Sequence, residues 1–132
     1  MEARCIKKYI PSSPVKMRLV VDQIRGKNAN EAIGILHFQP KRGARIAEQV
    51  LRSAIANLNN KLMDAGETRN EEEYVVKAAF VDVGPTLKRI QPAPQGRAYR
   101  AKKRANHLTI IVSDNKESKI NEVVEINNDK EE

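Results

Sequence analysis

The first half of the chain places its apolar residues three and four positions apart, which is the spacing of a single helix face. Three segments have this pattern, at residues 13–26, 29–39 and 41–63. The first begins at Ser13, a favoured N-cap residue that is followed by proline. We therefore predict three helices, whose apolar stripes are Met17, Val20, Val21 and Ile24, then Ala29, Ala32, Ile33 and Leu36, then Ala47, Val50, Leu51, Ala54, Leu58 and Leu62.

The second half of the chain changes from the helical period to a period of two. Residues 74–81 and 108–113 alternate in the way that strands do. The N-terminal run 4–10 is predicted to be a third strand, with Ile6 and Ile10 on one face and a lysine on the other. This order of elements predicts an α+β fold, in which three helices pack on a small antiparallel three-stranded sheet.

A connection of 23 residues, 84–106, joins the last two predicted strands and is rich in glycine and proline. Such long connections are uncommon in compact domains unless they have a function or are disordered. If the segment continues both strands as a hairpin, each half of about 11 residues reaches roughly 35 Å at about 3.3 Å per residue. A body of this size has a radius of gyration of only about 13 Å. The hairpin is therefore predicted to protrude, and Pro92 and Pro94 predict an irregular turn at its tip in place of a strand ladder.

The charge divides the chain into two parts. Of the formal net charge of +7, residues 115–132 contribute −3 and residues 1–114 contribute +10. The last segment has few large apolar residues and no aromatic ones, which predicts a disordered acidic tail. We predict one globular domain at residues 1–114, which includes the basic hairpin at 84–106.

The composition excludes several classes of protein. No apolar stretch approaches the roughly 18 to 20 residues that cross a bilayer, and no secretory signal is visible, so a cytoplasmic protein is expected. Cys5, His37 and His107 lack the spacing of a zinc site, and no metal or cofactor is predicted. The basic balance points to a polyanionic partner, with nucleic acid favoured over an anionic membrane surface.

Between Val83 and Ser113 the chain contains seven basic residues and not one acidic residue. Self-repulsion along such a segment is unfavourable, and a nucleic acid lying alongside would offset it. A flexible basic loop with no fixed partner is the open alternative. Base stacking by Tyr99 is a further possibility, beside a role in covering the hairpin stem. The seven basic residues are Lys88, Arg89, Arg97, Arg100, Lys102, Lys103 and Arg104.

Three blocks of sequence carry a resemblance to a known family. They are SSPVKMRLVVDQIRGK at 12–27, LRSAIANLNN at 51–60, and FVDVGPTLKRI followed by GRAYRAKKRANHLTIIVSD within 80–114. The chain resembles, over nearly its whole length except the acidic tail, the bacterial-type family of large ribosomal subunit protein number 22. It departs from the usual family pattern, a basic and then a small residue before Gly96, by having Ala93 and Pro94. These residues predict a stiffer and less charged tip.

The resemblance implies a structural, non-enzymatic role in the large ribosomal subunit. The body would sit on the subunit exterior and support assembly, while the hairpin would thread through 23S-type rRNA and line the peptide exit tunnel. The implied partners are this rRNA, neighbouring large-subunit proteins and the nascent peptide, with no membrane and no small-molecule substrate. The implied rRNA-binding residues are Ser12, Ser13, Lys16, Arg18, Arg25, Lys27, Lys88, Arg89, Gly96, Arg97, Arg100, Lys102, Lys103, Arg104 and His107. The implied tunnel-lining tip consists of Lys88, Arg89, Ile90, Gln91, Pro92, Ala93, Pro94 and Gln95.

Two other hypotheses fit parts of the sequence. A DNA-bending architectural protein would use a proline-bearing basic arm in the minor groove, and such proteins usually work as symmetric dimers. An enzyme acting on nucleic acid would need clustered carboxylates for a metal ion. The acidic run 71–73 is the visible cluster, but it is remote in sequence from the basic arm. His107 is assigned with equal weight to phosphate binding and to a structural role.

Overall fold

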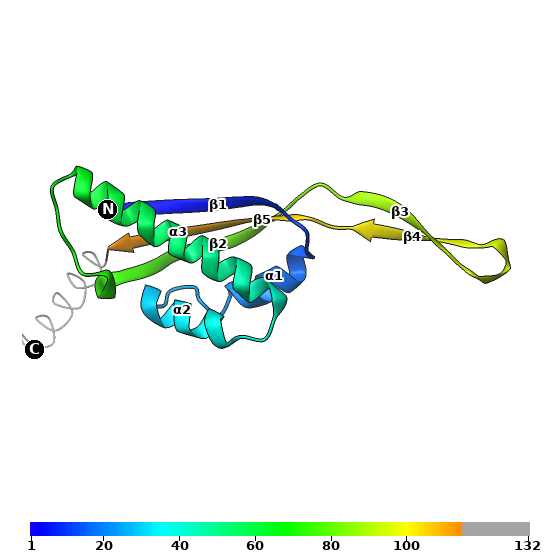
Figure 1. The fold of residues 1–132 in the computed structure, drawn as a ribbon, viewed down its shortest axis with the longest axis horizontal. Helices are drawn as coiled ribbons and strands as arrows, with labels where there is room; N and C mark the ends of the chain where they lie inside the picture. The colour runs from blue at the N-terminus through cyan, green and yellow to red at the C-terminus, as the bar shows by residue number, and fades with distance from the viewer. Residues whose placement is uncertain (115–132) are drawn as a thin grey trace, which may run out of the picture.

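The structure, a computed structural model, describes residues 1–114, and the predicted acidic tail at 115–132 lies outside the described residues (Figure 1). Short 3-10 turns at Glu71–Glu73 and Pro94–Gly96 accompany its helices and strands. In chain order the elements are β1 (Glu2–Ile10), α1 (Pro14–Val21), α2 (Ala29–Phe38), α3 (Arg42–Asp64), β2 (Tyr74–Val83), β3 (Leu87–Pro92), β4 (Ala98–Lys103) and β5 (Asn106–Asp114). These elements confirm the predicted α+β fold.

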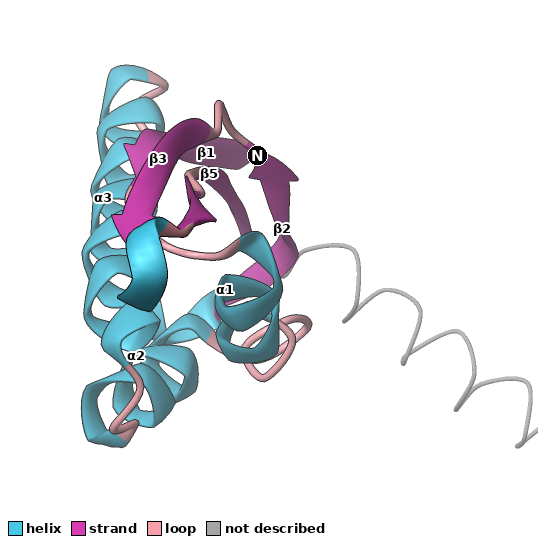
Figure 2. Ribbon diagram, turned by 90° about the vertical axis from the view of Figure 1, so that its right-hand side faces the viewer, coloured by secondary structure: helices cyan, strands magenta, loops and turns pink. Residues whose placement is uncertain are grey.

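The strands form two separate antiparallel sheets. The larger sheet has the order β1-β5-β2, so that the last strand of the described chain lies between the first two. Figure 2 shows the three helices gathered on one side of this sheet. The smaller sheet pairs β3 with β4 and forms the protruding hairpin. Among residues 1–114, no helix has both the length and the apolar character to cross a membrane.

The long helix α3 crosses the sheet and supplies much of the core. Every residue of its predicted apolar stripe is at most 3% exposed, from Ala47 to Leu62. Strand β5 also agrees with its prediction, because its inward residues Leu108, Ile110 and Val112 are fully buried beneath the helices. The apolar residues of α3 and of β5 keep one spacing along the whole element, and the predicted buried face of each is therefore confirmed.

The first helix ends earlier than the sequence predicted. It stops at Val21, and a turn occupies the residues up to Gly26. The reason is a competing interaction with the sheet: the Gly26 N–H donates to the Val76 carbonyl at 3.0 Å, and the Val76 N–H donates to the Lys27 carbonyl at 2.9 Å. Gly26 has a φ of +76°, which favours glycine and turns the chain away from the helix axis.

The N-caps of the first two helices behave differently from each other. Ser13 occupies the predicted N-cap position of α1, but its side chain makes no capping hydrogen bond, which corrects the expectation from sequence. Asn28 caps α2, since its Oδ1 accepts from the Asn30 N–H at 3.0 Å. The asparagine side chain therefore supplies the acceptor that starts α2.

Irregularities in β1 and β2 break the predicted alternation. Ile6 is 44% exposed while Ile10 is 1% exposed, so the prediction that they share a face was wrong. A register shift between Lys7 and Ile10, with Tyr9 at a φ of +58°, moves the inward face by one position. A second shift, between Val76 and Ala78, has the same effect in β2. Its inward positions are therefore Tyr74, Val76, Ala79 and Val81.

Candidate nucleic-acid interface

The hairpin of β3 and β4, here called the arm, extends β2 and β5 away from the body along the long axis of the molecule (Figure 1). At its root the Gly84 N–H donates to the Ala105 carbonyl at 2.9 Å. A Cβ atom on Gly84 would lie only 3.0 Å from the carbonyl carbon of Ala105. The absence of a side chain therefore lets the two halves of the arm leave the body side by side.

The tip of the arm is a short irregular turn, as predicted. The Ala93 N–H donates to the Arg97 carbonyl at 2.9 Å, and Gln95 and Gly96 have φ values of +64° and +68°. The strand ladder extends closer to the tip than expected, because Pro92 still pairs with Ala98. Both proline peptide bonds in this region are trans, since no cis bond occurs among residues 1–114.

The pairing register distributes the positive charge over both faces of the arm. Residues directly opposite each other in an antiparallel pair share a face, and successive pairs alternate between faces. The pairs Lys88–Lys102 and Ile90–Arg100 therefore share one face, whereas Leu87–Lys103 and Arg89–Ala101 lie on the other. A polyanion that compensates all of these charges has to approach the arm from both sides.

Among residues 1–114, no carboxylate compensates the charge of the arm. All seven of its basic residues are exposed, and none forms an ion pair with a carboxylate of residues 1–114. Lys88 stands directly opposite Lys102, an arrangement that destabilises a strand pair. Leu87, Ile90 and Tyr99 are at least 54% exposed, so the arm has no core of its own. An external anionic surface would both screen the charges and cover these side chains.

The predicted N-terminal site residues serve partly to hold the body together. The Arg18 guanidinium donates to the Val81 carbonyl at 3.1 Å, and that of Arg25 donates to the Ala79 carbonyl at 2.7 Å. Both bonds protect the outer edge of β2, which has no neighbouring strand among residues 1–114. Lys27 lies 3.4 Å from a carboxylate oxygen of Glu31. The remaining members of this block, Ser12, Ser13 and Lys16, lie at a separate cavity.

His107 lies at the arm root, where it contacts β1. Its Nδ1 accepts a hydrogen bond from the Tyr9 N–H at 3.0 Å, and the two rings meet edge to face at 5.1 Å. Acceptance at Nδ1 requires the neutral imidazole to carry its proton on Nε2. The structural role is therefore present, and phosphate binding through Nε2 stays a prediction.

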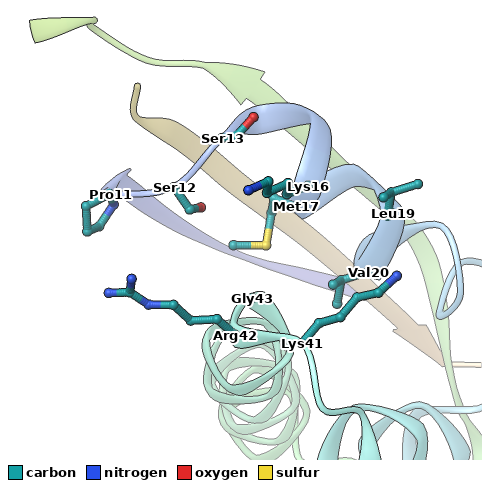
Figure 3. A pocket seen from close by; sticks show the side chains of 10 residues that line it. All are labelled: Pro11, Ser12, Ser13, Lys16, Met17, Leu19, Val20, Lys41, Arg42 and Gly43. Carbon is teal, nitrogen blue, oxygen red and sulfur yellow. The ribbon is translucent and has the colours of Figure 1, made fainter. Parts of the chain in front are cut away.

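Two cations that the sequence reasoning missed join this cavity. Lys41 and Arg42, at the start of α3, line it together with Ser12, Ser13 and Lys16, as Figure 3 shows. The cavity has a volume of about 430 Å³. A sequence signal was available, because two cations at the start of a helix oppose its dipole. Their proximity to Ser12 and Lys16 depends on the packing of α1 against α3.

Shifted pKa values occur at the end of the sheet opposite the arm, and their causes are local. The hydrogen bond from Lys77, at 2.6 Å, lowers the pKa of the Glu2 carboxyl. A hydrogen bond to Glu67 raises the pKa of Arg69, and burial raises the pKa of the Tyr74 phenol. These groups join the N-terminal strand and the linker to the body, and none of them faces the arm.

The acidic run 71–73 lies at this same end of the body. It leads into Tyr74, which pairs with Asp114, whereas the arm begins beside Asn106 at the other end of β5. A carboxylate oxygen of Glu71 accepts from the Asn59 side chain at 2.7 Å. Among residues 1–114, no three His, Cys, Asp or Glu side chains are grouped so that they can hold a metal ion. The acidic run and the basic arm therefore do not form one site.

A protein-family model and individual known proteins that are similar to this chain all belong to the same family. Residues 5–113 match the family model described as ribosomal protein L22p/L17e. The large ribosomal subunit protein uL22 of Chlorobaculum tepidum is 48% identical over 120 residues, which cover 91% of this chain and 98% of the relative. The proteins of the same name from Pelotomaculum thermopropionicum and Carboxydothermus hydrogenoformans are 47% and 49% identical over 117 residues, covering 89% of this chain and 99% of each relative.

Proposed function

The chain belongs to the ribosomal protein L22p/L17e family, and on this premise we propose that it is a structural constituent of the large ribosomal subunit in the cytoplasm. In this proposal its arm binds 23S-type rRNA and its tip lines the peptide exit tunnel. The family membership confirms the resemblance that the sequence blocks indicated. It favours a structural role over the enzyme and DNA-bending hypotheses, because the relatives carry the name of a ribosomal protein.

The observation that carries the rRNA-binding proposal is the charge on both faces of the arm. A protein that lies on the surface of a nucleic acid needs cations on one side only. Here Lys88 and Lys102 share one face while Arg89 and Lys103 share the other, with no acidic side chain between Val83 and Ser113. This arrangement suits a passage between RNA segments, where phosphates approach both faces.

The residues proposed to bind rRNA also include residues outside the arm. Lys16 is exposed and has no ion pair within residues 1–114, so it is available to a phosphate. Arg18 and Arg25 are also exposed. The Arg25 guanidinium also lies 3.0 Å from a carboxylate oxygen of Asp22, and both guanidinium groups keep donors that these contacts do not use. These two side chains would bridge the body sheet and the RNA. Ser12, Ser13, Lys27, Gly96 and His107 complete the proposed contacts outside the seven arm cations.

Salt dependence tests whether the arm dominates binding. If all seven arm cations meet phosphates, the logarithm of the association constant for isolated 23S-type rRNA should fall against log salt with an arm contribution of about −5 to −6. Each contact releases a counterion, and each contributes roughly 0.7 to 0.9 to the slope. Filter binding between low and high salt measures this value. A total slope near −1 or −2 would contradict the proposal.

Crosslinking tests the position of the tip. A photoreactive amino acid in place of Gln91 or Gln95, in assembled subunits, should crosslink both to rRNA and to a nascent peptide held on the ribosome. The same residue in place of Gln49, which is exposed on α3 in the body, is the matched control and should not reach the nascent peptide. Crosslinks from the tip to rRNA but not to the nascent peptide would support RNA binding by the tip and contradict the tunnel-lining role.

A further inference from the structure

The cavity between α1 and α3, here called the α1–α3 pocket, combines positive charge with an apolar wall. Lys16, Lys41 and Arg42 supply the charge, whereas Pro11 and Met17 are among the apolar lining residues. In Figure 3 the side chain of Met17 points into the pocket from α1, and that of Arg42 extends along the opposite side from α3. In the described part of the chain, no acidic residue lines the pocket.

The three cations have no compensating partner within residues 1–114. None of them forms an ion pair or a side-chain hydrogen bond there. Lys41 and Arg42 also stand at the positive end of the α3 dipole, where anions are favoured and cations are not. This placement is unfavourable for the isolated chain, and an anion in the pocket would reverse it.

Backbone donors reinforce the preference for an anion. α1 and α3 both begin at the pocket, neither has an acidic residue in its first turn, and neither N-cap side chain makes a capping hydrogen bond. Within residues 1–114, the N–H groups in the first turn of each helix therefore have no side-chain acceptor; Pro14, the first residue of α1, has no N–H. A Cβ on Gly43 would lie 3.1 Å from the Met17 sulfur, which shows how closely the two helices approach.

We propose that the α1–α3 pocket binds one unpaired nucleotide of RNA, with its phosphate on Lys16, Lys41 and Arg42 and its ribose or base against the exposed Pro11, next to the buried Met17. The inference rests on the proposed rRNA-binding function, and it extends the contact proposed for Lys16 to a defined pocket that includes Lys41 and Arg42. A bare phosphate would need only the cations. The apolar wall and the volume of about 430 Å³ suit a larger group with a flat apolar part.

The methionine methyl groups provide a direct test in the full chain. Of the three methionines, Met17 lines the pocket, while Met63 is 73% exposed near the far end of α3 and serves as an internal reference. With methyl-labelled methionine, a nucleoside 5′-monophosphate should shift the Met17 resonance and leave Met63 unchanged. Inorganic phosphate should shift Met17 less, and the unphosphorylated nucleoside should not shift it. Equal shifts with phosphate and with the nucleotide would overturn the nucleotide assignment in favour of an adventitious anion.

Substitution of the pocket cations tests their role in RNA binding. K41Q and R42Q should each reduce the salt slope for rRNA by about 0.7 to 0.9, because each removes one phosphate contact. K61Q is the matched control: it removes one charge from the same helix, 20 residues away and so about 30 Å distant at 1.5 Å per residue. Equal effects of all three substitutions would overturn the pocket inference.

The two proposals fail in distinguishable ways. If the wild-type chain does not bind rRNA with a steep salt slope, the proposed function itself fails. If it does bind, but K41Q and R42Q match K61Q and the Met17 methyl resonance stays in place during titration with rRNA fragments, only the pocket inference fails. Thermal unfolding of each variant checks that the substitutions leave the fold intact.

Discussion

Excision of the arm is expected to leave the body folded while the affinity for 23S-type rRNA falls by about 10³-fold or more near physiological salt. The variant replaces Thr86–Ala105 with a short turn between β2 and β5. No residue of β3 or β4 is buried, so the deletion removes no side chain from the core. The affinity falls because seven phosphate contacts are lost together. Circular dichroism and filter binding measure the two effects.

A second variant separates the charge of the arm from its shape. Replacing the seven basic residues with glutamine keeps the hairpin but removes the positive charges that would neutralise phosphates. This variant should bind rRNA almost as weakly as the excised chain. An excised chain that is unfolded would contradict the separation of arm and body. Retention of wild-type affinity by either variant would contradict the rRNA-binding proposal.

The elements that the sequence predicted best are those whose pattern is not interrupted. The stripe of α3 and the alternation of β5 run without a break, and each residue predicted to be inward is buried. β1 and β2 differ because one extra residue in each strand exchanges its two faces. Tyr9 has a positive φ, which a tyrosine in the sequence does not predict. No residue near Val76 and Ala78 indicates the bulge between them. Such irregularities depend on pairing with β5.

The candidate site also has one part that the sequence predicts and one part that it does not. The arm was predictable, because its length, prolines and absence of acidic residues are local properties of one segment. The α1–α3 pocket was not, since Ser12 and Lys41 are separated by 29 positions in sequence and meet only when α1 packs on α3. Sequence reasoning also assigned Arg18 and Arg25 to rRNA alone. Their hydrogen bonds to the carbonyls of β2 show that each of them has a structural role.

Replacement of Gly84 is expected to disrupt the arm root. In G84V the Cβ would meet the Ala105 backbone at 3.0 to 3.1 Å, and two methyl groups would add to the overlap. The clash forces β2 and β5 apart where they become the arm and weakens the hydrogen bond from the Gly84 N–H to the Ala105 carbonyl. Overpacking of this kind costs about 1 to 3 kcal/mol, and the melting temperature should fall by roughly 2 to 8 °C per kcal/mol for a domain of intermediate size.

A matched pair of alanine variants isolates this steric effect. G84A places one Cβ against backbone atoms, whereas G34A places it in α2 with no heavy atom within 4 Å. G34A should raise stability by up to about 1 kcal/mol through helix propensity, and G84A should lower it. Both keep every arm cation, so binding of isolated rRNA in low salt should change little. Incorporation of G84V into large subunits should fall, because a misdirected arm no longer matches a fixed RNA passage. Equal stability of the two alanine variants would show that the close approach at the root does not constrain the arm.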